Sequence, residues 1–153
     1  MHIIRAKPEH TDLVAPLFDA YRQFYKQKSD VAGGRAFIGE RLKKDQSVIF
    51  LALDGESNSQ QAVGFTQLYP SFSSSSMRRL WILNDLFVVP SARKQGVAEA
   101  LMERARRLAL ETKADGLTLE TATDNHTAQR LYEKLGYKKD VVYFRYNLVV
   151  SGP

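Results

Sequence analysis

Apolar and polar residues along this chain of 153 residues follow two spacings, one typical of strands and one typical of helices. Alternating or continuously apolar runs predict strands in six stretches: 2–6, 47–53, 62–68, 79–89, 117–122 and 141–150. Apolar residues recur at helical spacing in four stretches: 13–25, 36–44, 98–110 and 128–135. The order β-α-α-β-β-β-α-β-α-β predicts an α+β fold with a mixed sheet, and 1–153 is expected to be a single domain.

Proline, glycine and serine predict where these elements break. Pro16 lies inside the first helical stretch and is expected to bend or divide that helix. Residues 29–30 offer a helix cap, and Gly33-Gly34 predicts a flexible point before the second helix. Residues 54–60 form a turn between two hairpin strands, whereas the five serines of 70–76 favour a mobile loop over a ligand-binding loop.

Composition narrows the classes of function. A net charge of +5 fits either attraction to a polyanion or ordinary solvated helix faces. The basic residues are dispersed and no aromatic-plus-basic RNA signature is present, so nucleic acid is the minority interpretation. The chain has no cysteine, and its three histidines lack metal-ligand spacing, so no metal is expected. No apolar run could span a bilayer, and residues 1–7 lack the long apolar segment of a secretory signal. The absence of a signal and the absence of cysteine together favour the cytosol.

One stretch predicts a phosphate site. The apolar strand that contains Asn84-Asp85-Leu86-Phe87-Val88 runs into the basic turn Arg93-Lys94-Gln95-Gly96-Val97-Ala98, which opens an amphipathic helix. Backbone N–H groups without partners at a helix N-terminus attract a phosphate, and small residues let it approach closely. Taken by itself, this stretch is explained equally well by an ordinary helix start, in which Gly96 and Ala98 allow close packing. P-loop and Gly-x-Gly-x-x-Gly patterns are absent.

A second motif lies at 125–137, where Asn125 precedes an apolar helix that carries Tyr132 just before Gly136. With both motifs in order and a strand between them, the chain resembles the GNAT superfamily of N-acetyltransferases. Residues 83–88 and 131–137 are most similar to the branch that holds polyamine and small histone or protein acetyltransferases. The resemblance implies a mostly antiparallel twisted sheet of six to seven strands with about four helices, splayed between the fourth and fifth strands.

The same resemblance implies acetyl-CoA as cosubstrate. Residues 93–98 would bind its pyrophosphate, and the free backbone of Leu86, Phe87 and Val88 would bind the pantetheine arm, with one N–H polarising the thioester carbonyl. Asn125 would bind pantetheine or phosphate, although a helix N-cap explains Asn125 at least as well. Transfer would be direct, within a ternary complex, because without cysteine the commonest covalent route is missing.

Tyr132 is the sharpest catalytic candidate. In the family the equivalent tyrosine acts as general acid and protonates the departing thiolate. A packed tyrosine is the structural alternative, because Ala128 and Leu135 share its helix face.

The general base is harder to assign. The polyamine branch has a glutamate where this chain has Asn84, followed by Asp85. Asp85 or Glu120 could take the proton of the amine directly or through water, but Asp85 could equally be a buried structural carboxylate. Strand alternation points Asn84 and Asp85 to opposite faces unless a bulge intervenes.

The acceptor cleft is expected near five aromatic side chains, for which core packing is the default alternative: Tyr21, Phe24, Tyr25, Tyr69 and Phe72. Of these, Tyr25 and Tyr69 are predicted to bind substrate together with Glu120. The acceptor is expected to be a primary amine, whether a small amine, an amino acid, a polyamine or a protein lysine. A CoA-binding regulatory module without turnover is the alternative function. The apolar stretch 141–150 also suggests a sheet edge that pairs in a homodimer.

Overall fold

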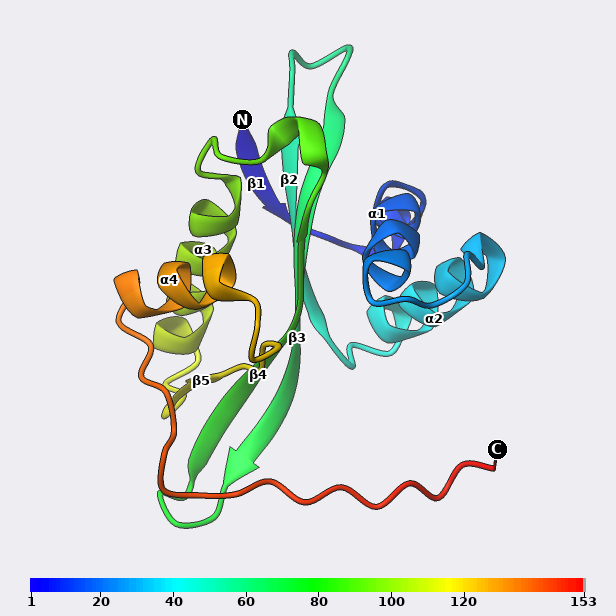
Figure 1. The fold of residues 1–153 in the computed structure, drawn as a ribbon. Helices are drawn as coiled ribbons and strands as arrows, with labels where there is room; N and C mark the ends of the chain where they lie inside the picture. Colours follow the sequence, from blue (N-terminus) through cyan, green and yellow to red (C-terminus); the bar gives the residue numbers. More distant parts are fainter. Residues whose placement is uncertain (153) are drawn as a thin grey trace. The chain divides into compact units, whose positions relative to one another are not determined.

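The computed structural model describes residues 1–152 and divides the chain into two compact units, one from Met1 to Glu120 and one from Thr121 onward. Figure 1 shows the elements of both units. The first unit contains β1 (His2–Arg5), α1 (Thr11–Phe24), α2 (Val31–Lys43), β2 (Val48–Asp54), β3 (Gln61–Ser73), β4 (Arg78–Val88), α3 (Val97–Glu111) and β5 (Gly116–Thr118). Short 3-10 turns cover Pro8–His10 and Pro90–Ala92. The second unit contains α4 (His126–Lys134). That the whole chain is one domain stays a prediction.

The strands of the first unit form one mixed sheet in the order β1-β2-β3-β4-β5. The first three pairings are antiparallel and the pairing of β4 with β5 is parallel, which confirms the α+β class. Helices α1 and α2 cover one face of this sheet and α3 covers the other (Figure 1). Strand β2 is therefore buried on both faces: Ile49 and Leu51 join the α1/α2 core, and Phe50 lies 4.3 Å beneath the Arg104 guanidinium of α3.

The structure corrects the expectations at two positions in the N-terminal helices. Pro16 does not divide α1, which is continuous, and a bend at Pro16 stays a prediction. The N–H that proline lacks would have bonded to the Asp12 carbonyl, which lies in the exposed first turn where water can donate to it. Gly33-Gly34 is not a flexible point, because α2 begins before it at Val31. Asp30 caps that helix by accepting a hydrogen bond from the Gly33 N–H at 2.9 Å. At Gly34, a β-carbon would lie 3.2 Å from the Phe18 ring, so glycine lets α1 and α2 pack closely.

The serine-rich stretch was also wrongly assigned. Strand β3 extends through Ser73, and Pro70 pairs with Trp81 of β4. Proline is tolerated there because the β2 ladder on the other side of β3 ends at Leu68, so Pro70 occupies an edge position where no N–H is needed. Only the end of the predicted loop, from Ser74, forms the turn into β4.

Strands β4 and β5 separate early. Their ladder joins Leu80 to Gly116 and Ile82 to Thr118, and then stops. Beyond Ile82, β4 continues to Val88 along β3 alone. This is the splay between the fourth and fifth strands that the resemblance implied, and it leaves one edge of residues 83–88 without a strand neighbour among the described residues.

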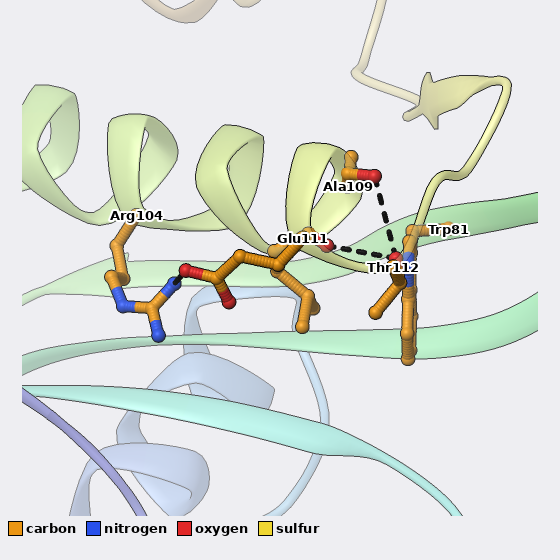
Figure 2. A network of polar contacts seen from close by, with 6 residues as sticks. Trp81, Arg104, Ala109, Glu111 and Thr112 are labelled. Carbon is orange, nitrogen blue, oxygen red and sulfur yellow. Dashed lines mark hydrogen bonds and ion pairs between the residues drawn. The ribbon is translucent and has the colours of Figure 1, made fainter.

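Hydrogen bonds join the C-terminal end of α3 to β4 (Figure 2). The Trp81 indole N–H donates to the Thr112 hydroxyl at 2.9 Å, and that hydroxyl donates to the Leu108 carbonyl at 2.8 Å. On α3 itself, Arg104 and Glu111 form an ion pair at 3.6 Å. Because Trp81 is buried, its N–H would lose its partner if the Thr112 hydroxyl were removed.

We expect Thr112→Val to lower the free energy of unfolding by about 0.5 to 1.5 kcal/mol, the net contribution of a typical hydrogen bond, because this bond is only partly buried. Urea denaturation followed by circular dichroism measures this loss. Thr118→Val is the matched control, because Thr118 is exposed on β5 and should change stability by less than about 0.5 kcal/mol. Equal effects of the two changes would contradict this role of Thr112.

The second unit has one regular element. Asn125 caps α4 by accepting a hydrogen bond from the Ala128 N–H at 3.2 Å, and Gly136 ends it with a positive φ of 94°. The predicted strand 141–150 was wrong: this segment forms no strand, and the described residues contain five paired strands where six or seven were expected. Among residues 1–152, no helix is long and apolar enough to cross a membrane.

Candidate active site

A β-bulge in β4 brings the two candidate polar residues together. Gln67 of β3 pairs with Asp85, whereas the next residue, Leu68, pairs with Leu83, so Asn84 is the extra residue on β4. Strand alternation alone would have pointed Asn84 and Asp85 to opposite faces. With the bulge, the Asn84 amide donates to Oδ1 of Asp85 at 2.8 Å.

The Asp85 carboxylate is almost completely buried, with 2% of the residue exposed. Its second oxygen, Oδ2, accepts a hydrogen bond of 2.5 Å from the Gln67 amide. The Ser47 hydroxyl donates to the carbonyl oxygen of that same amide at 2.8 Å. Ser47 therefore fixes which end of Gln67 faces Asp85, and the carboxylate is held by two oriented donors.

Two tyrosines complete this cluster. The Tyr21 hydroxyl donates to the Asn84 carbonyl at 3.2 Å and lies beside the Asp85 carboxylate. Burial raises the pKa of Asp85, and hydrogen bonds from Asn84, Gln67 and Tyr21 only partly oppose that rise. Burial and the neighbouring Asp85 charge raise the pKa of Tyr21 and bring that of Tyr69 to about 12. Both phenols therefore keep their protons at neutral pH.

The raised pKa of Asp85 gives a testable pH dependence of stability. The folded protein holds this proton more tightly than the unfolded chain, so the free energy of unfolding falls as pH rises from the ordinary value of 3.8 through the folded pKa. Asp85→Asn removes this contribution. We expect the melting temperature of the variant, relative to the native protein, to rise across that pH window and to level off above it. Parallel melting curves across the pH series would contradict a raised pKa.

The turn before α3 has an unusual backbone. Lys94 and Gly96 both have positive φ, 62° and 79°, and alternation of this kind gathers neighbouring N–H groups on one side. Gly96 is the N-cap of α3 and offers no side chain to its first N–H groups. A β-carbon on Gly96 would meet nothing within 4 Å, so close packing does not explain this glycine. The left-handed backbone does.

Arg93 is tied to the end of β4. Its Nε donates to the Val88 carbonyl at 2.9 Å, and its guanidinium lies 5.6 Å from the Phe87 ring centre and 5.9 Å from that of Phe24. The side chain thus holds the turn against the strand. Lys94 and Gln95 are exposed beside it. The neighbours Val97 and Ala98 contribute backbone here, with the Val97 side chain buried in the core.

The predicted acceptor residues do not all gather in one place. Tyr25 is half exposed, and its ring centre lies 4.9 Å from that of Tyr21, which joins it to the Asp85 cluster. Tyr69 belongs to the same cluster through its electrostatic contact with Asp85. Phe72 is exposed at the far end of β3, beside Arg79, and Glu120 is exposed two residues beyond β5.

Two predicted residues, Asn125 and Tyr132, belong to the second unit. Asn125 makes the N-cap bond given above, so the structural role foreseen for it is present. Tyr132 lies on α4 with its ring centre 6.2 Å from that of Tyr137 and is half buried. The cofactor and catalytic roles of these two residues stay predictions.

Gln67 and Ser47 are the residues that sequence reasoning missed. Both belong to apolar stretches in which a single polar residue is easily assigned to a solvated strand face. The available signal was that Gln67 is the only amide in the apolar run 62–68. A buried polar side chain needs a partner, and Asp85 on the next predicted strand was the nearest candidate.

Sequence comparison agrees with this geometry. Residues 14–137 match the Acetyltransferase (GNAT) family. The chain belongs to that family. It is 47% identical over 150 residues to an uncharacterized N-acetyltransferase, YhfO, of Bacillus subtilis (strain 168), covering 98% of each protein. It is 30% identical over 138 residues to a probable acetyltransferase of Haemophilus influenzae, covering 90% of each. A crystal structure of a probable acetyltransferase, 44% identical, superposes over 100% of both chains with a TM-score of 0.92.

This GNAT protein is accordingly an N-acetyltransferase, of a family that uses acetyl-CoA as cosubstrate. Within residues 1–152, no cluster of three or more histidine, aspartate or glutamate side chains could hold a metal ion. The side chains gathered around Asp85 supply carboxylate, phenol and amide groups.

Proposed function

We propose that this GNAT protein transfers the acetyl group of acetyl-CoA directly to a primary amine within a ternary complex. The observation that carries the proposal is the open edge of β4 beyond Ile82, which leads within a few residues to the glycine-capped start of α3. A strand edge with no strand neighbour among residues 1–152 suits the amides of a pantetheine arm, and a helix N-terminus without a side-chain cap suits a pyrophosphate.

The start of α3 supports the phosphate end of this proposal. The first N–H groups of the helix have no intrahelical partner, and the positive end of the helix dipole lies at the same place. Gly96 leaves open space where a side chain would otherwise stand. The exposed Lys94 adds positive charge, and Gln95 is an additional donor, while Arg93 fixes the shape of the turn through Val88.

Strand β4 supports the part of this proposal that concerns the pantetheine arm and the acetyl group. Bound acetyl-CoA would supply an activated thioester, whose carbonyl oxygen gains negative charge during transfer. In our proposal, the backbone of Leu86, Phe87 and Val88 binds the pantetheine amides, and one strand N–H donates to that oxygen. The side chains of Phe87 and Val88 are buried in the core, so they can hold this backbone rigidly.

Proton transfer completes the mechanism. An ammonium group must lose a proton before nitrogen can attack, and we assign that proton to Asp85, reached directly or through water. The raised pKa of this carboxyl suits a base better than that of an exposed aspartate. Asn84, which replaces the expected carboxylate, would orient Asp85 through its amide. We assign protonation of the leaving thiolate to Tyr132, and an additional cosubstrate contact to Asn125.

The acceptor would approach the cluster of Tyr21, Tyr25 and Tyr69 around Asp85. Phenol rings and one carboxylate suit an amine whose charge is modest, because the net charge of +5 disfavours a polycation. As acceptors, we rank a small amine or an amino acid equally with a protein lysine, and we rank a polyamine below them. Glu120 would be a further contact for the acceptor. A homodimer in the cytosol is part of the same proposal.

Release of free thiol from acetyl-CoA, measured with a panel of amines, tests this function. We expect release that depends on the amine, and mass spectrometry should find one added acetyl group on the amine and none on the protein. A saturable complex with acetyl-CoA that releases no thiol with any amine would instead favour a regulatory CoA-binding module. A covalently acetylated enzyme that forms before amine is added would contradict direct transfer.

A further inference from the structure

Arg41, in the last turn of α2, is more buried than a solvated surface cation. Only 19% of its side chain is exposed, and its guanidinium lies 4.6 Å from the Phe37 ring centre. One nitrogen, Nη2, forms an ion pair with Glu40 at 3.1 Å. Nε is buried and has no hydrogen-bond partner among residues 1–152. Buried donors are nearly always paired in native proteins, so this guanidinium has hydrogen-bonding capacity that the chain itself does not use.

Glu40 does not neutralise the positive charge around Arg41. Its Oε1 accepts a hydrogen bond from the Lys44 ammonium at 2.7 Å, while its Oε2 faces the Arg41 guanidinium. One carboxylate is thus shared between two cations. An additional anion can therefore bind at Arg41 without meeting an excess of negative charge.

The backbone links Arg41 to the Asp85 cluster. The Gln46 N–H donates to the Arg41 carbonyl at 2.9 Å and closes the turn after α2. The next residue, Ser47, donates to the Gln67 amide, and that amide donates to Asp85. The turn that positions Arg41 therefore also positions the hydroxyl that orients the partner of Asp85.

Tyr69 lies within electrostatic range of both charges. It follows Leu68, which pairs with Val48 at the start of β2, directly after the turn that carries Ser47. Burial and the Asp85 charge raise the pKa of the Tyr69 phenol, and the Arg41 guanidinium opposes that rise. A negative and a positive group thus act on one phenol of the cluster, which has been assigned to the acceptor.

Such a pair of charges matches a zwitterion. An amino acid carries an amine and a carboxylate in one small molecule, and a guanidinium presents planar donors that fit a carboxylate. Stacking on Phe37 restricts the Arg41 side chain, so less freedom is lost when it binds. A simple amine would leave Arg41 without an anion, and a polyamine would bring a second positive charge toward it.

We propose that Arg41 binds the carboxylate of the acceptor, so that the acceptor is an amino acid whose amine is directed toward Asp85. This inference rests on the acetyl transfer proposed above and selects one of the acceptor classes that were ranked equally there. The transfer itself is unchanged: nitrogen bonds to the acetyl carbon, the carbon–sulfur bond breaks, and the amine proton goes to Asp85.

Matched pairs of acceptors test this inference in the native protein. Each pair is an amino acid and its carboxamide, which keeps the amine and replaces the carboxylate with a neutral group of similar size. With thiol release as the assay, we expect the best amino acids to have a KM lower than that of their carboxamides by about tenfold or more, as one charge-assisted contact would give.

Three variants show whether Arg41 causes this preference. In Arg41→Gln, the KM ratio of carboxamide to amino acid should fall by about tenfold, whereas kcat for the amino acid should change much less, because the carboxylate is bound equally before and during transfer. Arg41→Lys keeps the charge and should recover part of the ratio. Lys43→Gln removes an exposed cation from the same turn of α2 and should keep the native ratio.

The outcomes separate this inference from the proposed transfer. Turnover of carboxamides as good as that of amino acids in the native protein would overturn carboxylate binding and leave acetyl transfer intact, and it requires no variant to fold. A native KM ratio in Arg41→Gln, with circular dichroism showing a folded protein, would overturn the role of Arg41. No thiol release with any amine would overturn the proposed transfer and this inference together.

Discussion

Tyr132→Phe is expected to lower kcat by about 100-fold or more, because the variant keeps the ring but loses the proton that the leaving thiolate needs. The dissociation constant of acetyl-CoA should change little, since the proposed role operates only as the carbon–sulfur bond breaks. Steady-state thiol release gives kcat, and isothermal titration calorimetry gives the dissociation constant.

Tyr137→Phe is the matched control for that experiment. Its ring centre lies 6.2 Å from that of Tyr132 in the same unit, so it has the same kind of surroundings and no proposed proton to give. We expect its kcat to stay near the native value. If Tyr132→Phe turned over at the native rate, or if both variants lost activity equally, another group would have to protonate the thiolate.

Gly96→Val is expected to weaken acetyl-CoA binding by about tenfold or more. The backbone at Gly96 has φ of 79°, a conformation that costs a β-branched residue on the order of 1 to 3 kcal/mol. The turn must either bear that strain or lose the arrangement of N–H groups at the start of α3, and 1.4 kcal/mol is already tenfold in affinity. Calorimetric titration with acetyl-CoA measures the change.

Gly116→Val controls for the added side chain. Gly116 also has nothing within 4 Å of an added β-carbon, but its φ is not in the left-handed region and it lies on β5. Gly96→Ala adds the strain with less bulk and should fall between the native protein and Gly96→Val. A native dissociation constant for Gly96→Val would contradict the phosphate site at α3.

Much of the fold was predictable because local patterns decide it. The helical spacing at 98–110 predicted α3 within one residue at each end, since a buried stripe of leucine and alanine faces the sheet. The apolar stretch 47–53 predicted β2, because a strand between two helical layers is apolar throughout. The splay between β4 and β5 came from the family resemblance and not from any local pattern.

The errors occurred where a residue depends on distant partners. Pro70 signals a loop by itself, and only the early end of the β2 ladder makes a strand possible there. Gly33 and Gly34 signal flexibility, and only Asp30 and Phe18 explain their place in a helix. The segment 141–150 has the correct strand pattern, but a strand also requires an edge to pair with.

The candidate site was predictable in part for the same reason. The phosphate turn is a continuous stretch, so its glycine and basic residues were visible in the sequence. The Asp85 cluster combines residues of α1, β3 and β4 with Ser47, which directly precedes β2, and it depends on a bulge that no periodicity shows. The amide of Gln67 and the hydroxyl of Ser47 could therefore be recognised only in the folded structure.

Amide chemical shifts during a titration with acetyl-CoA test the central claim most directly. In ¹⁵N-labelled protein, the backbone amides of residues 94–98 should show the largest, saturable shifts, because their N–H groups are proposed to bind the pyrophosphate. The amides of 86–88 should shift with the same dissociation constant. Saturable binding that leaves residues 94–98 unchanged, or no binding, would contradict the account.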